Sequence, residues 1–270
     1  MGSKFSKNGC FHFPTMDKRN LDTLKDYLCN YNPPGSYGDC INILLVGMVG
    51  AGKSSLINTF LSALDPQGVT MTCVPMGMNP RSLTKELRYY RAGNLKFWDT
   101  AGWNALEHND QTIRVLQMIL EGRIPKGTNL HSFNPESDVA NYSIIPENVI
   151  HGVTFIFNID TTDLISEDKM KVFQEIQMIV AEKHVHRVVI GTKFETLGIP
   201  EKHNVRVYEY EPLQRKFQNL AERTGMDRRS MFVVSNQWKG GHIEMIQCIL
   251  ALYVLDNMVR NIDRLLKAVQ

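Results

Sequence analysis

The sequence has few cysteines and no pattern that groups them. Five cysteines occur among 270 residues, without a CxxC motif and without cysteine–histidine spacing. A disulfide framework and a structural zinc site both require such patterns, so we exclude them and expect a reducing, cytoplasmic environment. The formal net charge is only +2. Proteins that coat nucleic acid normally carry a strong basic excess, so we expect no nucleic-acid partner.

The chain also lacks a long hydrophobic run. It has no stretch of about 18 consecutive apolar residues and no secretory leader. The most apolar late run, residues 248–255, ends at Asp256 and predicts a buried helix. Hydrophobic residues make up 43% of the chain and charged residues 21%, which is typical of a globular domain. We expect a soluble body built around one large domain.

The first residues fit a lipidation signal. Gly2 follows the initiator Met and Ser6 stands at the preferred position, which matches the pattern for N-myristoylation. Cys10 could take a palmitoyl group, and a second signal of this kind is needed because one myristoyl chain binds membranes weakly. An unmodified start is the alternative. We expect residues 1–16 to form a flexible arm that associates with a membrane through acylation at Gly2 and Cys10.

Alternating patterns divide the rest of the chain. Residues 17–36 predict a short amphipathic helix and a linker, and residues 37–270 predict one α/β domain. Strands are expected at 41–46, 83–91, 95–99, 153–158, 187–191 and 231–235, and helices at 54–64, 110–121, 167–182, 212–224 and 242–268. Strands alternating with helices indicate a mainly parallel sheet with helices on both faces. Residues 122–146 show no periodicity, which is typical of a functional or disordered loop.

The strongest motif lies between the first strand and its helix. Residues Gly47–Ser54 match the P-loop pattern Gly-x-x-x-x-Gly-Lys-Ser, in the strand–loop–helix context that the pattern requires. Backbone N–H groups of such a loop converge on phosphate oxygens at a helix N-terminus. Lys53 would reach the β- and γ-phosphates, and the Ser54 hydroxyl would bind Mg²⁺. The other phosphate-binding residues are predicted to be Val49, Gly50, Ala51, Gly52 and Ser55.

A second motif follows the strand at 95–99. Asp99 and Gly102 resemble the DxxG motif of GTPases, where the Asp holds Mg²⁺ and the Gly N–H meets the γ-phosphate. A turn-capping role for Asp99 is the alternative. Thr84 is our first candidate for the threonine that closes over the metal, ahead of Thr70 and Thr72. Trp103 stands where Ras-like GTPases have a water-orienting glutamine, so hydrolysis is expected to be slow. Val49 favours the same conclusion, because its branched side chain replaces a glycine beside the γ-phosphate.

The base is predicted from two later loops. Thr192, Lys193 and Glu195 follow a strand at the position where GTPases carry their guanine-reading motif. Lys193 would lie along the base, and the Glu195 carboxylate would accept hydrogen bonds from the guanine N1–H and 2-amino groups. A glutamate replaces the usual aspartate, so the geometry must shift. Ser235 and Asn236 are expected in the last base-facing loop. A surface loop without a ligand is the alternative for both segments.

These residues together resemble a known family. The chain from Ile41 onward resembles the GTP-binding domain of the interferon-induced protein 44 family, through the P-loop, the motif around Asp99 and the segments 119–123, 133–135 and 233–236. The resemblance implies a cytoplasmic, interferon-inducible, immune-associated protein that binds GTP or GDP with Mg²⁺ as cofactor. We expect the short arm to stand in place of the family's usual N-terminal domain. Some members have degraded nucleotide motifs, which leaves hydrolysis open.

Three functions remain in competition. We expect a GTP-binding switch with slow Mg²⁺-dependent hydrolysis, in which Lys53, Ser54, Asp99 and Thr84 are the catalytic group. The first alternative is a non-hydrolysing, nucleotide-bound scaffold that recruits partners at a membrane. The second is a P-loop ATPase, against which the residues 192–195 argue. The protein effector is not identifiable from the sequence. A homodimer through residues 17–31 or the C-terminal helix also stays open, although packing on their own core is the commoner use of such helices.

Overall fold

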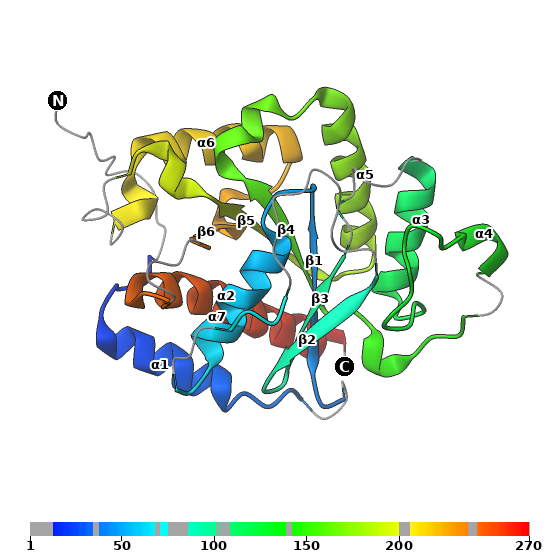
Figure 1. The fold of residues 1–270 in the computed structure, drawn as a ribbon, viewed down its shortest axis with the longest axis horizontal. Helices are drawn as coiled ribbons and strands as arrows, with labels where there is room; N and C mark the ends of the chain where they lie inside the picture. The colour runs from blue at the N-terminus through cyan, green and yellow to red at the C-terminus, as the bar shows by residue number, and fades with distance from the viewer. Residues whose placement is uncertain are drawn as a thin grey trace.

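The chain folds around a six-stranded sheet (Figure 1). The computed structural model describes residues 13–34, 38–67, 71–74, 86–100, 102, 109–138, 142–199, 206–236 and 242–269. The strands lie in the order β2-β3-β1-β4-β5-β6. Only β2 runs antiparallel to its neighbour, and the other pairs are parallel. Their bounds are β1 Ile41–Gly47, β2 Arg88–Ala92, β3 Leu95–Asp99, β4 Gly152–Asn158, β5 His186–Thr192 and β6 Met231–Val234.

Helices cover both faces of the sheet, as the alternation predicts. On β1, Ile41, Ile43 and Leu45 point to a cluster built with helices α1, α2 and α7, whereas Leu44 and Val46 point to the opposite cluster with α3, α5 and α6. The α-helices are α1 Lys18–Cys29, α2 Lys53–Leu64, α3 Asn109–Leu120, α4 Pro135–Asp138, α5 Glu167–Glu182, α6 Glu211–Thr224 and α7 Met245–Val269. Short 3₁₀ helices are η4 Pro146–Asn148, η5 Ile159–Leu164, η6 Phe194–Leu197 and η8 Arg228–Ser230. The predicted α/β P-loop NTPase fold is confirmed.

Helix α7 requires one correction. It begins at Met245, three residues after the predicted start. By length and composition alone, Met245–Ala268 could cross a membrane, although polar residues interrupt its apolar sequence. Yet 56% of its most apolar window is buried inside the fold. It packs against α1 and α2, and Leu250, Leu252 and Leu255 are almost completely buried, so it is the core helix that the run 248–255 predicts.

Helix α1 packs on this same core helix. The hydroxyl of Tyr31, just after α1, donates a hydrogen bond of 2.6 Å to Asp263, and the Arg260 guanidinium lies 4.1 Å from the Tyr27 ring centroid. The apolar faces of α1 and α7 therefore pack against each other within one chain, which is the commoner use of such helices. The domain boundaries at 16 and 36 stay a prediction, as does a homodimer.

The stretch 122–146 is better anchored than its lack of periodicity indicated. Leu130 and Phe133 are buried in the core, and the backbone of Leu87 exchanges hydrogen bonds with Gly127 and Thr128. The described part of the stretch therefore packs beside the start of β2. Apolar residues spaced irregularly along a loop give no periodic signal, although each can still fill a gap in the core.

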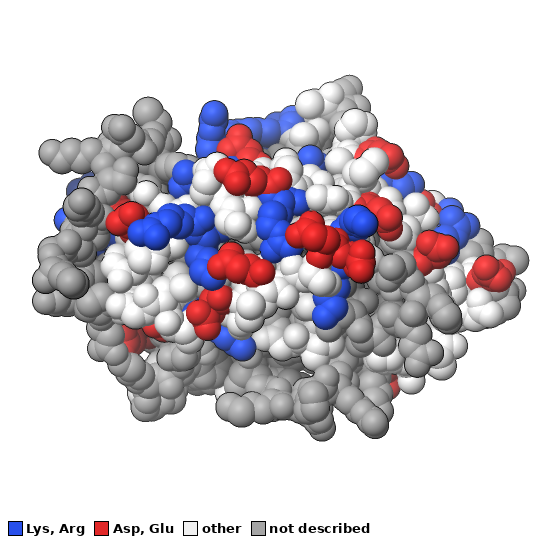
Figure 2. Space-filling view, turned by 90° about the horizontal axis from the view of Figure 1, so that it is seen from above, with Lys and Arg blue, Asp and Glu red and all other residues white. Residues whose placement is uncertain are grey.

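The predicted site segments meet at one edge of the sheet. Because β1, β3, β4, β5 and β6 are parallel, their carboxyl ends lie side by side, and ligands of such sheets bind there. The P-loop follows β1, Asp99 ends β3, and the segments after β5 and β6 carry the predicted base contacts. Figure 2 shows one face of the molecule, on which basic and acidic side chains are interspersed.

Candidate functional site

The P-loop adopts a backbone that only glycine tolerates easily. Gly50 and Gly52 have φ angles of +79° and +95°, in the left-handed region. Gly52 caps the N-terminus of α2, and a Cβ there would lie 3.2 Å from the Asn236 amide nitrogen. These glycines therefore allow a tight turn and a close approach of the last base-facing loop. The resulting concave row of N–H groups at a helix N-terminus is suited to phosphate.

Lys53 is a buried cation inside this loop. Its side chain is only 8% exposed, and its ammonium donates hydrogen bonds of 2.9 Å to the Gly47 carbonyl and 3.1 Å to the Met48 carbonyl. Burial lowers the pKa of Lys53 to about 8, opposed by the nearby Asp99 carboxylate, which raises it. A buried ammonium with a depressed pKa gains from an anionic partner, so this position favours a bound phosphate.

Ser54 and Asp99 form an oxygen-rich corner beside Lys53. The Ser54 hydroxyl donates a hydrogen bond of 2.9 Å to one Asp99 carboxylate oxygen, and Asp99 is 2% exposed. A hydroxyl and a buried carboxylate at this distance are the hard oxygen donors that Mg²⁺ prefers. The donor set therefore fits the predicted metal. Thr84 and Thr70 lie outside the described residues, so their metal role stays a prediction, and Thr72 is exposed.

Gly102 lies directly against the phosphate loop. A Cβ at this position would come within 2.5 Å of the Val49 backbone nitrogen and 2.6 Å of a Val49 methyl carbon. Only a glycine fits here without a shift of the loop. The two predicted motifs therefore meet, with the Val49 side chain at their junction. Trp103 lies outside the described residues, and its effect on hydrolysis stays a prediction.

The segment after β5 is tied to the phosphate loop. The buried Thr192 hydroxyl donates a hydrogen bond of 2.7 Å to the Ala51 carbonyl, and the Phe157 carbonyl lies 3.1 Å from the same oxygen and can share its one proton. Lys193 follows in the left-handed region, with a φ of +58°, and its side chain is exposed. Thr192 thus joins the two loops, and the sharp turn at Lys193 brings Glu195 back toward the end of β6.

Glu195, Ser235 and Gln247 form a chain of hydrogen bonds. The Ser235 hydroxyl donates to one Glu195 carboxylate oxygen and accepts from the Gln247 amide at 3.1 Å. The other Glu195 oxygen is buried and has no hydrogen-bond partner among the described residues. A buried carboxylate oxygen without a donor is costly, and a base N–H could satisfy it. Gln247 was not predicted, because nothing in the helical pattern of α7 distinguishes it.

Asn236 completes the contact between the last loop and the phosphate loop. Its amide nitrogen donates a 3.4 Å hydrogen bond to the Gly52 carbonyl, and its amide oxygen accepts from the Thr59 hydroxyl at 3.0 Å. The structure therefore brings together the phosphate loop, Asp99, Gly102 and both base-facing loops. Ser55 lies in the first turn of α2, at the same helix N-terminus. Gly2 and Cys10 lie outside the described residues, so lipidation and membrane association stay predictions.

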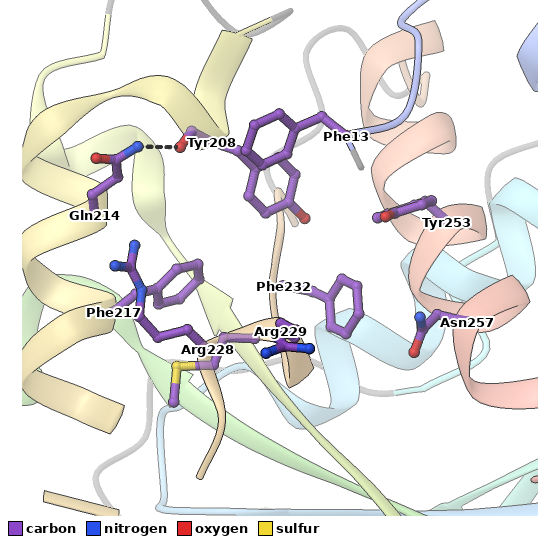
Figure 3. A pocket seen from close by; sticks show the side chains of 10 residues that line it. Phe13, Tyr208, Gln214, Phe217, Arg228, Arg229, Phe232, Tyr253 and Asn257 are labelled. Atoms are coloured by element: carbon purple, nitrogen blue, oxygen red, sulfur yellow. Dashed lines mark hydrogen bonds between the residues drawn. The ribbon is translucent and has the colours of Figure 1, made fainter. Parts of the chain in front are cut away.

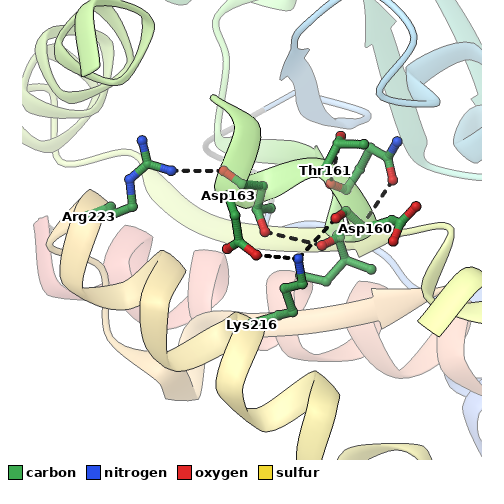
Figure 4. Close-up of polar contacts among 8 residues, drawn as sticks. Asp160, Thr161, Asp163, Lys216 and Arg223 are labelled. Atoms are coloured by element: carbon green, nitrogen blue, oxygen red, sulfur yellow. Dashed lines mark hydrogen bonds and ion pairs between the residues drawn. The ribbon is translucent and has the colours of Figure 1, made fainter. Parts of the chain in front are cut away.

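A cavity of about 220 Å³ adjoins the phosphate loop. It is bounded by residues Met48–Ala51 of the loop, by the end of β4 and by η5. Two side chains of α6 hold η5 in place (Figure 4): the Lys216 ammonium donates to the Asp160 carbonyl at 3.0 Å, and the Arg223 guanidinium donates to the Thr162 carbonyl at 2.8 Å. Asn158 and Thr161 line this cavity and were missed by sequence reasoning. The position of Asn158, a polar residue at the end of a buried strand, is the sequence feature that could have predicted its place at the site.

Comparison of the sequence with curated proteins finds relatives in one family. Interferon-induced protein 44 from Mus musculus is 24% identical over 264 residues, which cover 92% of this chain and 60% of that protein. The Homo sapiens protein is 24% identical over 260 residues, covering 91% and 57%. The resemblance to the interferon-induced protein 44 family is confirmed. The chain spans about 60% of the length of these relatives. No family model matches the chain.

A solved structure supports the fold. A dimerization-deficient mutant of Toc33 from Arabidopsis thaliana aligns with a TM-score of 0.52, covering 93% of this chain and 94% of that one. The sequence identity is 13%. The similarity therefore lies in the arrangement of sheet and helices.

Proposed function

We propose that this chain binds GTP with Mg²⁺ and acts as an interferon-inducible switch that hydrolyses GTP slowly. One observation carries the proposal: the guanine-type loop at Thr192–Glu195 packs directly on the P-loop, through the hydrogen bond from Thr192 to the Ala51 carbonyl. A phosphate cradle and a base-reading carboxylate are thereby held on one rigid edge. The interferon-induced relatives support the immune setting.

The phosphate half would act by charge. Backbone N–H groups of residues 49–55 and the Lys53 ammonium would hold the β- and γ-phosphates. Ser54 and Asp99 would hold Mg²⁺, which when bound neutralises charge that develops between these phosphates. The Lys53 ammonium donates to the Gly47 and Met48 carbonyls, which holds its side chain inside the loop that would cradle the phosphates.

The base half would select guanine by donor and acceptor pattern. Guanine presents N1–H and 2-amino donors to a carboxylate, whereas adenine presents an acceptor at N1. Glu195 has one oxygen fixed by Ser235 and one buried oxygen without a partner, which is the arrangement that an additional donor would complete. This favours GTP over the alternative of an ATPase on the same cradle.

A non-hydrolysing scaffold is the second candidate. Val49 supports it, because its side chain stands at the junction with Gly102, on the side where a γ-phosphate and an attacking water would lie. The intact Lys53, Ser54 and Asp99 support real Mg²⁺–nucleotide binding in either case. The two candidates differ only in turnover.

Titration calorimetry with GTP, ATP and inosine triphosphate tests the proposal, each with Mg²⁺ and with a chelator. We expect GTP to bind at least about tenfold more tightly than ATP, since a charged hydrogen bond is at stake. Inosine triphosphate, which lacks the 2-amino group, should fall between them, and the chelator should weaken all three. Equal affinity for GTP and ATP would refute the guanine assignment. A turnover assay on the same protein then separates the slow GTPase from the scaffold.

A further inference from the structure

A second cavity lies at the opposite end of β6 from the nucleotide site. It has a volume of about 200 Å³ and opens between α6, the start of β6 and α7 (Figure 3). Its walls are mainly apolar and aromatic, with contributions from Tyr208, Phe217, Met231, Phe232 and Tyr253. The Phe232 and Tyr253 rings meet edge to face with centroids 5.7 Å apart. Nothing in the proposed GTP chemistry uses this cavity.

Phe13, at the beginning of the described chain, forms one wall. Its ring stacks on Tyr208, with centroids 5.2 Å apart and an interplanar angle of 14° (Figure 3). The Tyr208 ring is itself fixed, because its hydroxyl accepts a 3.1 Å hydrogen bond from the Val233 backbone N–H. Phe13 is 37% exposed and is the first described residue, so the preceding segment is joined to the fold at the rim of the cavity.

The residues around Phe13 direct an earlier side chain to the same place. Pro14 follows Phe13 and restricts it to extended backbone. In an extended segment, side chains two positions apart point to the same side. Extended backbone continued through residue 12 would place Phe11 on the same side of the chain as Phe13, two positions before the rim.

The size of the cavity suits a single aromatic ring. An apolar cavity of about 150 Å³ takes a benzene molecule, so about 200 Å³ accommodates one phenyl group. A myristoyl chain on Gly2 needs more room than one ring. We propose that residues 1–12 of this chain dock against this cavity and that the Phe11 ring fills it. The docked segment would hold the end that carries Gly2 beside β6 rather than free in solution.

Photo-crosslinking in the full-length chain tests this proposal. Benzoylphenylalanine replaces Phe11 in one protein and Phe5 in a matched control, which alters the same residue type in the same segment. From position 11 we expect a cross-link within one chain to the peptide that contains Met231 and Phe232, mapped by mass spectrometry. Position 5 should give little of this product. Equal products from both positions would overturn the proposal, and cross-links between two chains would identify a second copy as the occupant.

Trypsin cleavage after Lys7 gives an independent readout. Cleavage of a docked segment follows the population in which it is undocked, so Phe11→Ala should speed cleavage by about tenfold and Phe5→Ala should leave it unchanged. Unchanged cleavage in Phe11→Ala would contradict docking. The cross-link from position 11 should persist in N-myristoylated protein. Its loss there would show that the acyl chain is the occupant and that the assignment to Phe11 is wrong.

Discussion

The two halves of the nucleotide site are built in different ways. In the phosphate half, Lys53 and Asp99 are buried at 8% and 2% exposure, and their partners are backbone carbonyls and the Ser54 hydroxyl. In the base half, Lys193 is exposed, and Glu195 keeps one buried oxygen without a partner among the described residues. The phosphate half is held mainly by backbone carbonyls and one hydroxyl, whereas the base half depends on side chains from three separate segments.

The difference follows from what each half recognises. Phosphate is a symmetric anion that backbone N–H groups and one cation can bind. The backbone geometry of the glycine-rich loop therefore decides whether phosphate binds. A base is recognised by a directional pattern of donors and acceptors, which requires side chains at defined positions. Glu195 reaches its position through Ser235 and Gln247, which lie in distant parts of the chain.

Removing the Lys53 charge should have the largest effect, and in opposite directions on binding and on stability. Lys53→Met should weaken GTP binding by about 100-fold, because a charged phosphate contact is lost. The pKa of Lys53 is lowered to about 8 by burial, so its charge destabilises the fold. Removing this charge should therefore raise the stability of the variant over the parent by up to about 3 kcal/mol below pH 8, offset in part because the Gly47 and Met48 carbonyls lose a donor. The pH-dependent gain should vanish as the pH rises toward about 10.4.

Calorimetry measures the binding and urea unfolding at several pH values measures the stability. Lys171→Met on α5 is the matched control, because it removes the same charge from an exposed position outside the nucleotide site and should leave binding and stability unchanged. A stability difference between Lys53→Met and the parent that stays the same as the pH rises would contradict the assignment of Lys53 as a buried charge.

Glu195→Gln should change selectivity more than overall phosphate binding. The amide keeps the size of the side chain but places a donor where guanine also presents donors. GTP affinity should fall by about 10- to 100-fold, since a hydrogen bond to a charged group is lost, and ATP affinity should stay the same. Competition binding with both nucleotides measures the ratio, with Glu211→Gln on α6 as control. A parallel loss for GTP and ATP would place Glu195 outside base recognition.

Gly102→Ala probes how tightly the phosphate half is packed. The new methyl group would meet the Val49 backbone nitrogen at 2.5 Å, so the loop must shift. We expect a loss of about 1–3 kcal/mol in stability from overpacking, with weaker GTP binding. Adding Val49→Gly removes the 2.6 Å methyl contact but not the backbone contact, so rescue should be partial. Thermal unfolding with and without GTP measures both effects; full stability in Gly102→Ala would mean that the loop is loose.

The same division explains how far the site could be predicted from the sequence. Lys53 and Ser54 belong to one continuous motif, and Asp99 ends the neighbouring strand. Chain order alone therefore places the three side chains together. The contact of Thr192 with the phosphate loop follows from the parallel sheet. The hydrogen bond from Gln247 to Ser235 and those from Lys216 and Arg223 to η5 could not be predicted. They arise from tertiary packing between segments that share no sequence pattern. Such contacts leave no periodic or local signal.

The N-terminal ends of the parallel strands lie opposite both halves of the nucleotide site. A histidine there should give a smaller and independent dependence of stability on pH. There the Asn42 backbone N–H donates a 2.9 Å hydrogen bond to His151 Nδ1, and burial lowers the pKa of His151 to about 4. The unfolded chain binds a proton near pH 6.5, so stability is full above that value and is lost as the pH falls toward 4. By pH 5 this loss should reach about 1–2 kcal/mol.

His151→Asn removes the titrating group while keeping an acceptor, so urea unfolding at pH 7 and pH 5 should show a smaller difference than in the parent. A residual slope should remain, because burial also lowers the pKa of His186 to about 4. The same substitution at the exposed His131 is the control and should leave the slope as it is. Since His151 touches neither half of the nucleotide site, GTP binding by folded protein should be unaffected. If the dependence of stability on pH is the same in His151→Asn as in the parent, the His151 ring of the parent is protonated in the fold at pH 5.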